Sequence, residues 1–257
     1  MFTTNHFIWL AICIIIEIGA VAWLYRHRPS LKSVLSFACI GAVLSEVIKT
    51  FSVMQIVPST DGTTMPMYME VGHLPFLLCS IQIISIFLAR FAKESEWKES
   101  LLAFMYPTCS AGAFLALMMP TIFSKSIDIS QAFTHPLAYQ YFLYHTMLIM
   151  LGIYIPMSKE VNIKPKHFFS SLGILSLLAF LSIYLNSMFA VPTYVDGELV
   201  SVDYTTNFFF TYETPIGIPL TEKWQWFLYL GIIVGVAVVM LFLFYLPYMV
   251  NGKKKKH

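Results

Sequence analysis

Long apolar stretches, separated by short polar segments, dominate the pattern of side chains along the chain. A helix that crosses the hydrocarbon core of a membrane needs about 20 mostly apolar residues. Seven stretches are close to this length, at about 6–25, 33–57, 73–91, 101–119, 137–157, 168–191 and 224–250. None of them shows the alternation of apolar and polar residues that is typical of a membrane β-barrel strand. The pattern therefore predicts an all-α polytopic membrane protein with seven transmembrane helices.

Basic residues cluster in alternate segments between these predicted spans. Most of the 16 Lys and Arg residues lie at 26–32, 90–98, 159–166 and 253–256, whereas most acidic residues lie in the other connecting segments. Cytoplasmic loops of membrane proteins are enriched in Lys and Arg. The charge pattern therefore predicts an N-terminus outside and a C-terminus inside, with residues 251–257 forming a basic cytoplasmic tail.

The composition excludes several classes of protein. Of the 257 residues, 58% are hydrophobic and 12% are charged, whereas soluble domains contain about 25% charged residues. A soluble enzyme, a nucleic-acid-binding protein and a disordered regulator are therefore excluded. We expect a single transmembrane domain over 1–257, located in the plasma membrane, with no nucleic-acid partner. The four cysteines lack metal-ligand spacing, so the sequence predicts no metal site and no cofactor.

The outer segment at about 192–223 is longer and more aromatic than the other connections. Long loops in compact proteins are often functional. We expect this loop to fold back over the outer mouth of the bundle as a lid; the alternative is a β-hairpin on the surface. The residues expected to form the lid or to contact lipid are Phe208, Phe209, Phe210 and Trp226.

Several polar side chains are predicted at one depth in the outer half of the membrane. With a rise of about 1.5 Å per residue, Cys79, His145 and Asn186 lie roughly 8–12 Å from the outer ends of their spans. The loop that contains Asn207 is predicted on the same side. A helix that begins at His73 would place Cys79 about two turns inside, where the helix dipole favours a thiolate. A nearby histidine could then accept the thiol proton.

Charged residues within spans are costly and are candidates for function. Glu17 lies in the first predicted span, whereas Glu46 and Lys49 lie in the second. The latter two are neighbours on one helix face and can pair. Two interpretations stay open for the three residues: a neutralised contact between helices, and a relay for protons or ions.

A set of short motifs resembles a known family of membrane proteins. These are His73–Leu74–Pro75 before Cys79, Tyr141–Phe142–Leu143–Tyr144–His145, Asn186, and Asn207–Phe208–Phe209 with Pro215 before Trp224 and Trp226. In this order, over about 70–230, they resemble the YwaF family of integral membrane proteins from Gram-positive and related bacteria. The resemblance implies a plasma membrane protein of a Gram-positive-type bacterium.

The resemblance also implies a chemistry. A eukaryotic relative resembles a transmembrane cysteine acyltransferase that moves a polyunsaturated acyl chain to an ether lysophospholipid, and more distant relatives hydrolyse esters with a threonine and a histidine. The nucleophile of the acyltransferase branch falls on Cys79 and its base falls on His145. A thiol in place of a threonine favours transfer over hydrolysis.

The leading hypothesis is a membrane-embedded acyltransferase that moves a fatty acyl chain between phospholipids or glycolipids through a Cys79 thioester, with lipid hydrolysis as a second outcome. His73, Asn186 and Asn207 are candidates to orient the substrate or to stabilise the oxyanion. The alternative is a non-catalytic component that binds lipid or solute, or a transporter subunit, in which the buried charges matter more. An intramembrane aspartyl protease is disfavoured because the predicted spans contain no pair of aspartates.

Overall fold

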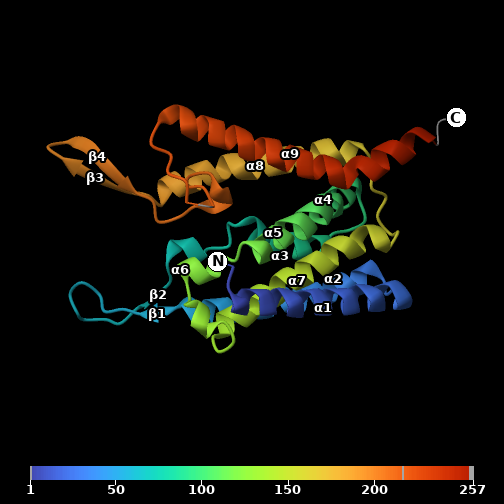
Figure 1. Cartoon of the computed structure of the whole chain (residues 1–257), viewed down its shortest axis with the longest axis horizontal. Helices are drawn as coiled ribbons and strands as arrows, with labels where there is room; N and C mark the ends of the chain where they lie inside the picture. The colour runs from blue at the N-terminus through green and yellow to red at the C-terminus, as the bar shows by residue number, and fades with distance from the viewer. Residues whose placement is uncertain (1, 216, 255–257) are drawn as a thin grey trace. The chain divides into compact units, whose positions relative to one another are not determined.

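The computed structural model describes residues 2–215 and 217–254, and helices make up most of them (Figure 1). The helices are α1 (Thr4–His27), α2 (Leu31–Val53), α3 (Leu78–Phe91), α4 (Glu96–Pro107), α5 (Ala113–Met118), α6 (Ile122–Lys125), α7 (Pro136–Met157), α8 (Lys166–Met188) and α9 (Lys223–Lys254). Short 3₁₀ turns are η1 (Val71–His73), η3 (Ile129–Gln131) and η4 (Phe208–Phe210), and a π-helical turn, η2 (Thr108–Gly112), joins α4 to α5. The strands β1 (Gln55–Ile56) and β2 (Met67–Tyr68) form one antiparallel pair, and β3 (Val191–Val195) and β4 (Glu198–Asp203) form another.

The helices agree closely with the apolar stretches in the sequence. Five helical segments are long and apolar enough to cross a membrane, which supports a multi-pass membrane protein. They are Thr4–His27, Leu31–Val53, Glu96–Met118, Lys166–Met188 and Lys223–Val250. The helix α3, with 14 residues, is shorter than a full crossing, and the continuous helix α7 is not among these five segments. Seven crossings and the outward N-terminus stay predictions, and the end of the predicted basic tail, 255–257, lies outside the described residues.

The chain forms two compact units. The first comprises Met1–Met69 and Leu78–Ile163, and the second comprises Glu70–Leu77 and Lys164–His257. The short segment Glu70–Leu77 thus belongs to the second unit, although the chain returns to the first unit directly before Cys79. The single domain expected over 1–257 stays a prediction.

Side-chain caps and proline positions set where several helices begin. The hydroxyl groups of Thr3, Ser30 and Ser95 accept hydrogen bonds from backbone N–H groups in the first turns of α1, α2 and α4. Such caps satisfy donors that the helix itself leaves unpaired. In α7, Pro136 occupies the first helical position, where the missing N–H costs nothing.

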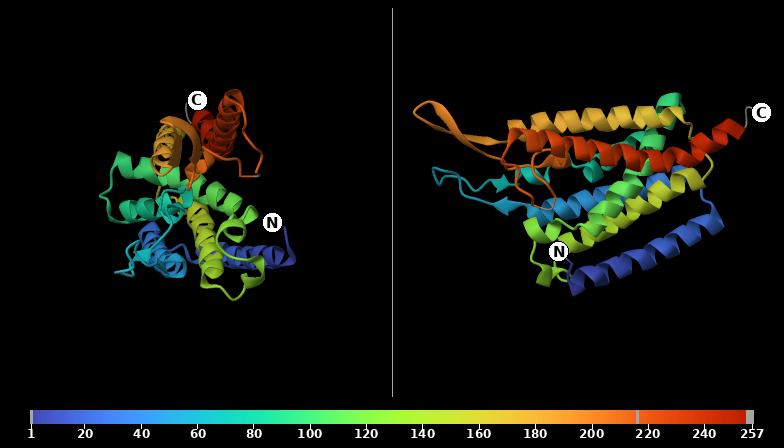
Figure 2. Two further views of the ribbon diagram at one scale, coloured as in Figure 1. Left: turned by 90° about the vertical axis from the view of Figure 1, so that its left-hand side faces the viewer. Right: turned by 45° about the horizontal axis from the view of Figure 1, so that its top comes forward.

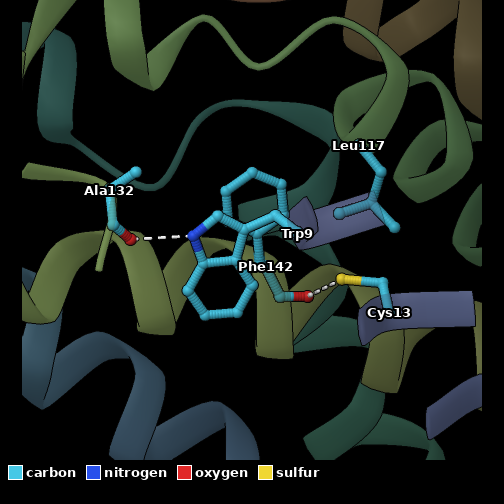
Figure 3. Close-up of a cluster of buried hydrophobic side chains, with 5 residues drawn as sticks. All are labelled: Trp9, Cys13, Leu117, Ala132 and Phe142. Carbon is cyan, nitrogen blue, oxygen red and sulfur yellow. Dashed lines mark hydrogen bonds between the residues drawn. The ribbon is translucent and has the colours of Figure 1, made fainter. Parts of the chain in front are cut away.

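In the first unit, α1 and α2 both pack against α7. Figure 3 shows how the N-terminal part of α1 is attached: the indole of Trp9 stacks on Phe142 with ring centroids 4.7 Å apart, and its Nε1–H donates to the carbonyl of Ala132 at 2.7 Å. One turn later the Cys13 thiol lies 3.9 Å from the carbonyl oxygen of Phe142. This contact places Cys13 in the packing of α1 on α7.

Two glycines allow close helix packing around α7. A Cβ atom on Gly41 would lie 2.3 Å from the sulfur of Met147. A Cβ atom on Gly152 would lie 2.2 Å from the Ser110 hydroxyl and 2.8 Å from the Ser110 backbone nitrogen. The π turn η2, which follows Pro107, therefore lies directly against α7 because residue 152 has no side chain.

In the second unit, α8 and α9 lie side by side (Figure 2). The hydroxyl groups of Ser171 and Tyr245 are 2.8 Å apart between these helices. The hairpin β3–β4 turns at Asp196 and Gly197, both with positive φ, as hairpin turns of this length require. Its side chains are largely exposed, so the first half of the aromatic loop is a hairpin, the alternative considered from the sequence.

The predicted start of the third apolar helix was wrong. The helix α3 begins at Leu78, and Val71–His73 forms a separate 3₁₀ turn. Pro75 disfavours helical angles at the preceding residue, and Leu74 is extended, with φ −60° and ψ 150°. Consequently His73 is not the cap of α3, and Cys79 lies in the first turn of α3 rather than two turns inside.

The close contact at Gly152 gives a first prediction. Gly152→Ala should lower the free energy of unfolding by about 1–3 kcal/mol, because the added methyl group overpacks the contact with η2. Gly173→Ala in α8 is the matched control, since a Cβ atom there meets nothing within 4 Å. The control should be neutral or stabilising. Thermal unfolding of the purified protein in detergent measures both, and equal behaviour of the two variants would contradict the packing described.

Candidate functional site

The two predicted catalytic residues both lie in the first unit, where α3 begins beside α7. The Tyr144 hydroxyl donates to the backbone carbonyl of Cys79 at 2.9 Å. Tyr144 directly precedes His145 in α7, so this bond attaches the backbone of the candidate nucleophile to the helix that carries the candidate base. Leu78 packs against Gly112 of η2, where a Cβ atom would lie 3.3 Å from its side chain. The first turn of α3 is therefore held from two directions.

His145 is buried and has one defined hydrogen bond. Its Nδ1 lies 2.6 Å from the carbonyl oxygen of Tyr141, and its side chain is 3% exposed. A carbonyl can only accept, so the neutral ring carries its proton on Nδ1. The other nitrogen, Nε2, is buried and has no hydrogen-bond partner among the described residues. The imidazole thus has the tautomer and the unused lone pair that a general base needs.

Tyr141 fixes the orientation of this imidazole. Its ring lies 4.3 Å from the His145 ring, measured between centroids, and its hydroxyl donates to the carbonyl of Ala116 at 2.7 Å. The bond to Ala116 prevents the phenol from turning away. The ring and the backbone of Tyr141 therefore both restrict the imidazole.

A charged pair on α2 lies close to the same place. Lys49 Nζ is 2.7 Å from Glu46 Oε1, which confirms the pairing expected from their spacing. The side chain of Lys49 is 13% exposed and that of Glu46 is 34% exposed. The helix α2 packs against both α3, which carries Cys79, and α7, which carries His145. The pair therefore lies on a helix adjacent to both candidate catalytic residues.

Glu17 does not join this pair by any ion pair or hydrogen bond within the described part of the chain. Both of its carboxylate oxygens are buried without a partner there. An unpartnered buried carboxyl group is costly in a spanning helix. Of the three charged residues expected from the sequence, Glu46 and Lys49 thus form an ion pair, and Glu17 is separate from them.

A buried polar network, which the sequence analysis missed in part, lies one turn further along α3. The Gln82 amide donates to the Thr108 hydroxyl at 3.0 Å, and its carbonyl oxygen lies 3.3 Å from the Cys109 sulfur. All three side chains are buried. The network connects α3 to the π turn η2. Its signal in the sequence was the group of small polar residues directly after Pro107.

The second unit contains Asn186, whose amide is fully occupied. Its nitrogen donates to the Phe208 carbonyl at 3.1 Å and to the Thr211 hydroxyl at 2.9 Å. Its oxygen accepts from the Thr206 hydroxyl at 3.0 Å and from the Phe208 backbone N–H at 2.8 Å. In this arrangement Asn186 positions the loop after β4 and has no remaining N–H group for an oxyanion.

Asn207 has a similar local role. Its amide nitrogen donates to the carbonyl of Glu213 at 2.8 Å, and its oxygen accepts from the N–H groups of Tyr212 and Glu213 at 3.1 and 3.2 Å. His73 also belongs to the second unit, where its backbone N–H donates to the Glu70 carbonyl at 3.0 Å. An oxyanion role for these three polar residues stays a prediction.

The aromatic segment of the predicted lid is strained and firmly held. Phe209 and Phe210 have φ of 55° and 53°, a left-handed conformation that costs about 1–2 kcal/mol per residue. The Trp226 indole donates to the Thr211 carbonyl at 2.9 Å, and the Tyr229 hydroxyl donates to the Phe210 carbonyl at 2.6 Å. These bonds from α9, with those of Asn186 from α8, hold the strained turn in place.

Phe208 links this turn to the segment that leads to Cys79. It is 1% exposed and packs edge-to-face on Phe76, with ring centroids 5.5 Å apart. Phe76 is three residues before Cys79 in the chain. The turn therefore packs against the segment Glu70–Leu77 within the second unit, and Phe208 acts in this packing. A lid role for the loop stays a prediction.

Outside the spans, carboxylates serve as caps of turns. Asp61 accepts hydrogen bonds from the hydroxyl groups of Ser59 and Thr63 and from the Thr63 backbone, which lowers its pKa to about 2. Hydrogen bonds from Ser130 likewise lower the pKa of Asp128. Both acids therefore stay charged near neutral pH and do not suit proton transfer.

The Asn186 contacts give a second prediction. Asn186→Asp keeps the two acceptor bonds but loses both donor bonds and places a charge against the Phe208 carbonyl. We expect the loop at 204–222 to become sensitive to proteases and the free energy of unfolding to fall by about 2–4 kcal/mol. Ser187→Ala, on the exposed face of the same helix turn, should resemble the wild type. Limited proteolysis with mass spectrometry checks this; an intact loop in Asn186→Asp would contradict the role of the amide.

Comparison with known protein families agrees with the membrane architecture. The model of the TMEM164 family matches residues 1–247. No curated protein and no solved structure matches the chain. The YwaF-like relation and the bacterial origin stay expectations from the sequence motifs. Because the match spans nearly the whole chain, this protein belongs to the TMEM164 family.

Proposed function

We propose that this member of the TMEM164 family is a membrane-embedded acyltransferase that moves a fatty acyl chain between phospholipids or glycolipids through a thioester on Cys79. The observation that carries the proposal is the state of His145. Its Nδ1 is bound to the Tyr141 carbonyl and its buried Nε2 has no partner among the described residues. A base of this kind, in the same unit as a cysteine in the first turn of a helix, suits nucleophilic catalysis.

The first half-reaction transfers the acyl group to the protein. The Nε2 of His145 accepts the thiol proton of Cys79, and the sulfur attacks the carbonyl carbon of a lipid ester. A carbon–sulfur bond forms and the carbonyl oxygen takes up negative charge. When this intermediate collapses, the ester carbon–oxygen bond breaks, and the leaving lyso-lipid oxygen takes the proton from His145. The products are a thioester and a lyso-lipid.

The second half-reaction returns the acyl group to a lipid. The hydroxyl group of an acceptor lipid gives its proton to His145 and attacks the thioester carbon. The new ester bond forms, the carbon–sulfur bond breaks, and Cys79 takes back the proton. Water as the acceptor would give a free fatty acid, so exclusion of water favours transfer over hydrolysis.

The position of Cys79 supports this chemistry. Backbone N–H groups in the first turn of a helix have no intrahelical partner, and their dipoles favour negative charge nearby. The bond from Tyr144 to the Cys79 carbonyl keeps that turn beside α7. Tyr144 thus holds the backbone of the nucleophile, and the base, His145, is the next residue of the same helix.

A second candidate is a non-catalytic membrane component that binds a lipid or a small solute. The buried, unpartnered carboxyl group of Glu17 favours it, because such a group in a spanning helix is often part of a binding or proton pathway. This alternative predicts that Cys79→Ser is silent and that Glu17→Gln is not.

Thioester trapping tests the proposal directly. In native membranes, the wild type and Cys109→Ser should carry a hydroxylamine-labile acyl group, detected by mass spectrometry of the intact protein. Cys79→Ser should carry none, and His145→Ala should acquire it at least 10²-fold more slowly, since a general base typically contributes 10²–10⁴. Added lysophospholipid should discharge the group. Acylation that persists in Cys79→Ser would overturn the proposal.

A milder variant tests the link between the two residues. Tyr144→Phe removes only the hydroxyl group that bonds to the Cys79 carbonyl, so acylation of Cys79 should slow by about 5- to 10-fold, which corresponds to one hydrogen bond of about 1 kcal/mol. Tyr139→Phe is the control, because Tyr139 lies on the same helix and donates to the Phe133 carbonyl at an exposed position. Equal acylation rates in the two variants would show that this bond does not position the nucleophile.

A further inference from the structure

A groove of about 370 Å³ lies between α2 and α3 in the first unit. Its wall is almost entirely apolar and is formed mainly by one face of α2, with Ile83 contributed by α3. The residues of α2 are Ala42, Val43, Glu46, Val47, Thr50 and Phe51. They span nine residue steps, or about 14 Å along the helix at about 1.5 Å per residue. An apolar face of this length can lie along one extended hydrocarbon chain.

The groove adjoins the candidate active site. Ile83 lies four residues after Cys79, which is about one helical turn. Glu46 lines the groove and holds Lys49 at 2.7 Å. Lys49 is four residues before the end of α2, so its backbone lies only about 6 Å from that end. Lys49 lies in the same turn of α2 as Glu46 and Thr50, which line the groove, and α2 packs against α3, the helix that carries Cys79.

The Lys49–Glu46 pair is unusual for a surface that faces lipid. Charges within a span are costly unless they are paired, and they usually mark a functional position. The contact with Glu46 fixes the position of the ammonium. An ammonium held in a poorly solvated site stabilises a nearby negative charge far more than it would in water.

We propose that this groove is the acyl-chain subsite of the acyl-transfer reaction and that Lys49 stabilises the oxyanion formed when Cys79 attacks the lipid ester. The inference rests on the proposed function, and it assigns the occupant as the fatty acyl chain of a membrane lipid. The ester lies at the level of Lys49 and Cys79, and the chain follows α2 from Thr50 toward Ala42. Neither Lys49 nor Glu46 gives or takes a proton in this scheme, so the proton balance between Cys79, His145 and the lipid oxygens is unchanged.

Removing the charge of Lys49 tests whether its ammonium stabilises the oxyanion. Lys49→Met should slow acylation of Cys79 by about 10²- to 10³-fold, as is typical for the loss of one oxyanion-stabilising group. Lys49→Arg keeps the charge and should restore the rate to within about tenfold of the wild type by the same reasoning. The matched control is Lys98→Met, which breaks another ion pair, with Glu94 at 2.5 Å. Thermal unfolding of each variant in detergent identifies any that is merely unstable.

Filling the groove tests the subsite. Val47→Trp should slow acylation by a long-chain phospholipid ester in vesicles far more than acylation by p-nitrophenyl acetate, which has no chain to place in the groove. Lys49→Met should slow both reactions. Ile18→Trp is the control for added bulk, because Ile18 is 65% exposed on α1. Equal loss with both esters in Val47→Trp would overturn the subsite, as would no loss at all.

Photo-crosslinking separates this inference from the proposed function. A phospholipid with a diazirine in its acyl chain should label the α2 segment at 42–51 in the wild type and should label it much less in Val47→Trp. If the wild type is never acylated, the proposed function is wrong, and so is the role of Lys49. In that case the crosslinks still show whether an acyl chain occupies the groove. A wild type that is acylated, with Lys49→Met and Val47→Trp behaving like their controls, would overturn this inference and leave the proposed function standing.

Discussion

The arrangement of the first unit depends on one constraint, which is that α7 carries many polar side chains in a region where the protein itself must supply their partners. Four of them bond to neighbouring segments across the unit. The pairs are Gln140 with Ser45, Tyr141 with Ala116, Tyr144 with Cys79, and Tyr154 with Pro29. Each bond orients another element around α7, and α3 is placed by the bond to Cys79. Against this background the Nε2 of His145, which has no partner in the part of the chain that the structure describes, is an exception on α7, and exceptions of this kind are expected at functional sites.

In the second unit, side-chain hydrogen bonds also restrain the backbone, but they hold a loop rather than neighbouring helices. Asn186 uses both donors and both acceptors of its amide to hold a turn whose residues Phe209 and Phe210 have left-handed angles. Two such residues in succession would relax without several bonds to restrain them. Because Phe208 packs on Phe76, the restraint reaches the segment that precedes Cys79. The asparagine that the sequence suggested as an oxyanion donor thus contributes through loop structure.

Hydropathy predicted where the helices lie, but it did not predict the details of the site. Apolar stretches indicate helices because burying backbone polar groups in lipid leaves few alternatives, and Glu46 and Lys49 were expected to pair because their spacing places them on one face. The start of α3 was wrong because one proline outweighed the apolar pattern at Leu74. The π turn at 108–112 and the hydrogen bonds of Asn186 depend on contacts between segments far apart in sequence, which periodicity does not reveal. Depth alone grouped Asn186 with Cys79, although the two residues belong to different compact units.

In the proposed reaction, the two sets of polar residues that appeared separate in the sequence take complementary roles. His145 is a neutral base without a charged partner, so it can accept a proton but does not balance the negative charge that forms on an ester oxygen. Lys49, which is paired with Glu46, supplies a fixed positive charge and takes no part in proton transfer. Separating these tasks avoids a conflict, since an ammonium bonded to the imidazole would occupy the lone pair that the reaction needs. The lack of a partner for Nε2 among the described residues and the presence of one at Lys49 are therefore both consistent with the proposed reaction.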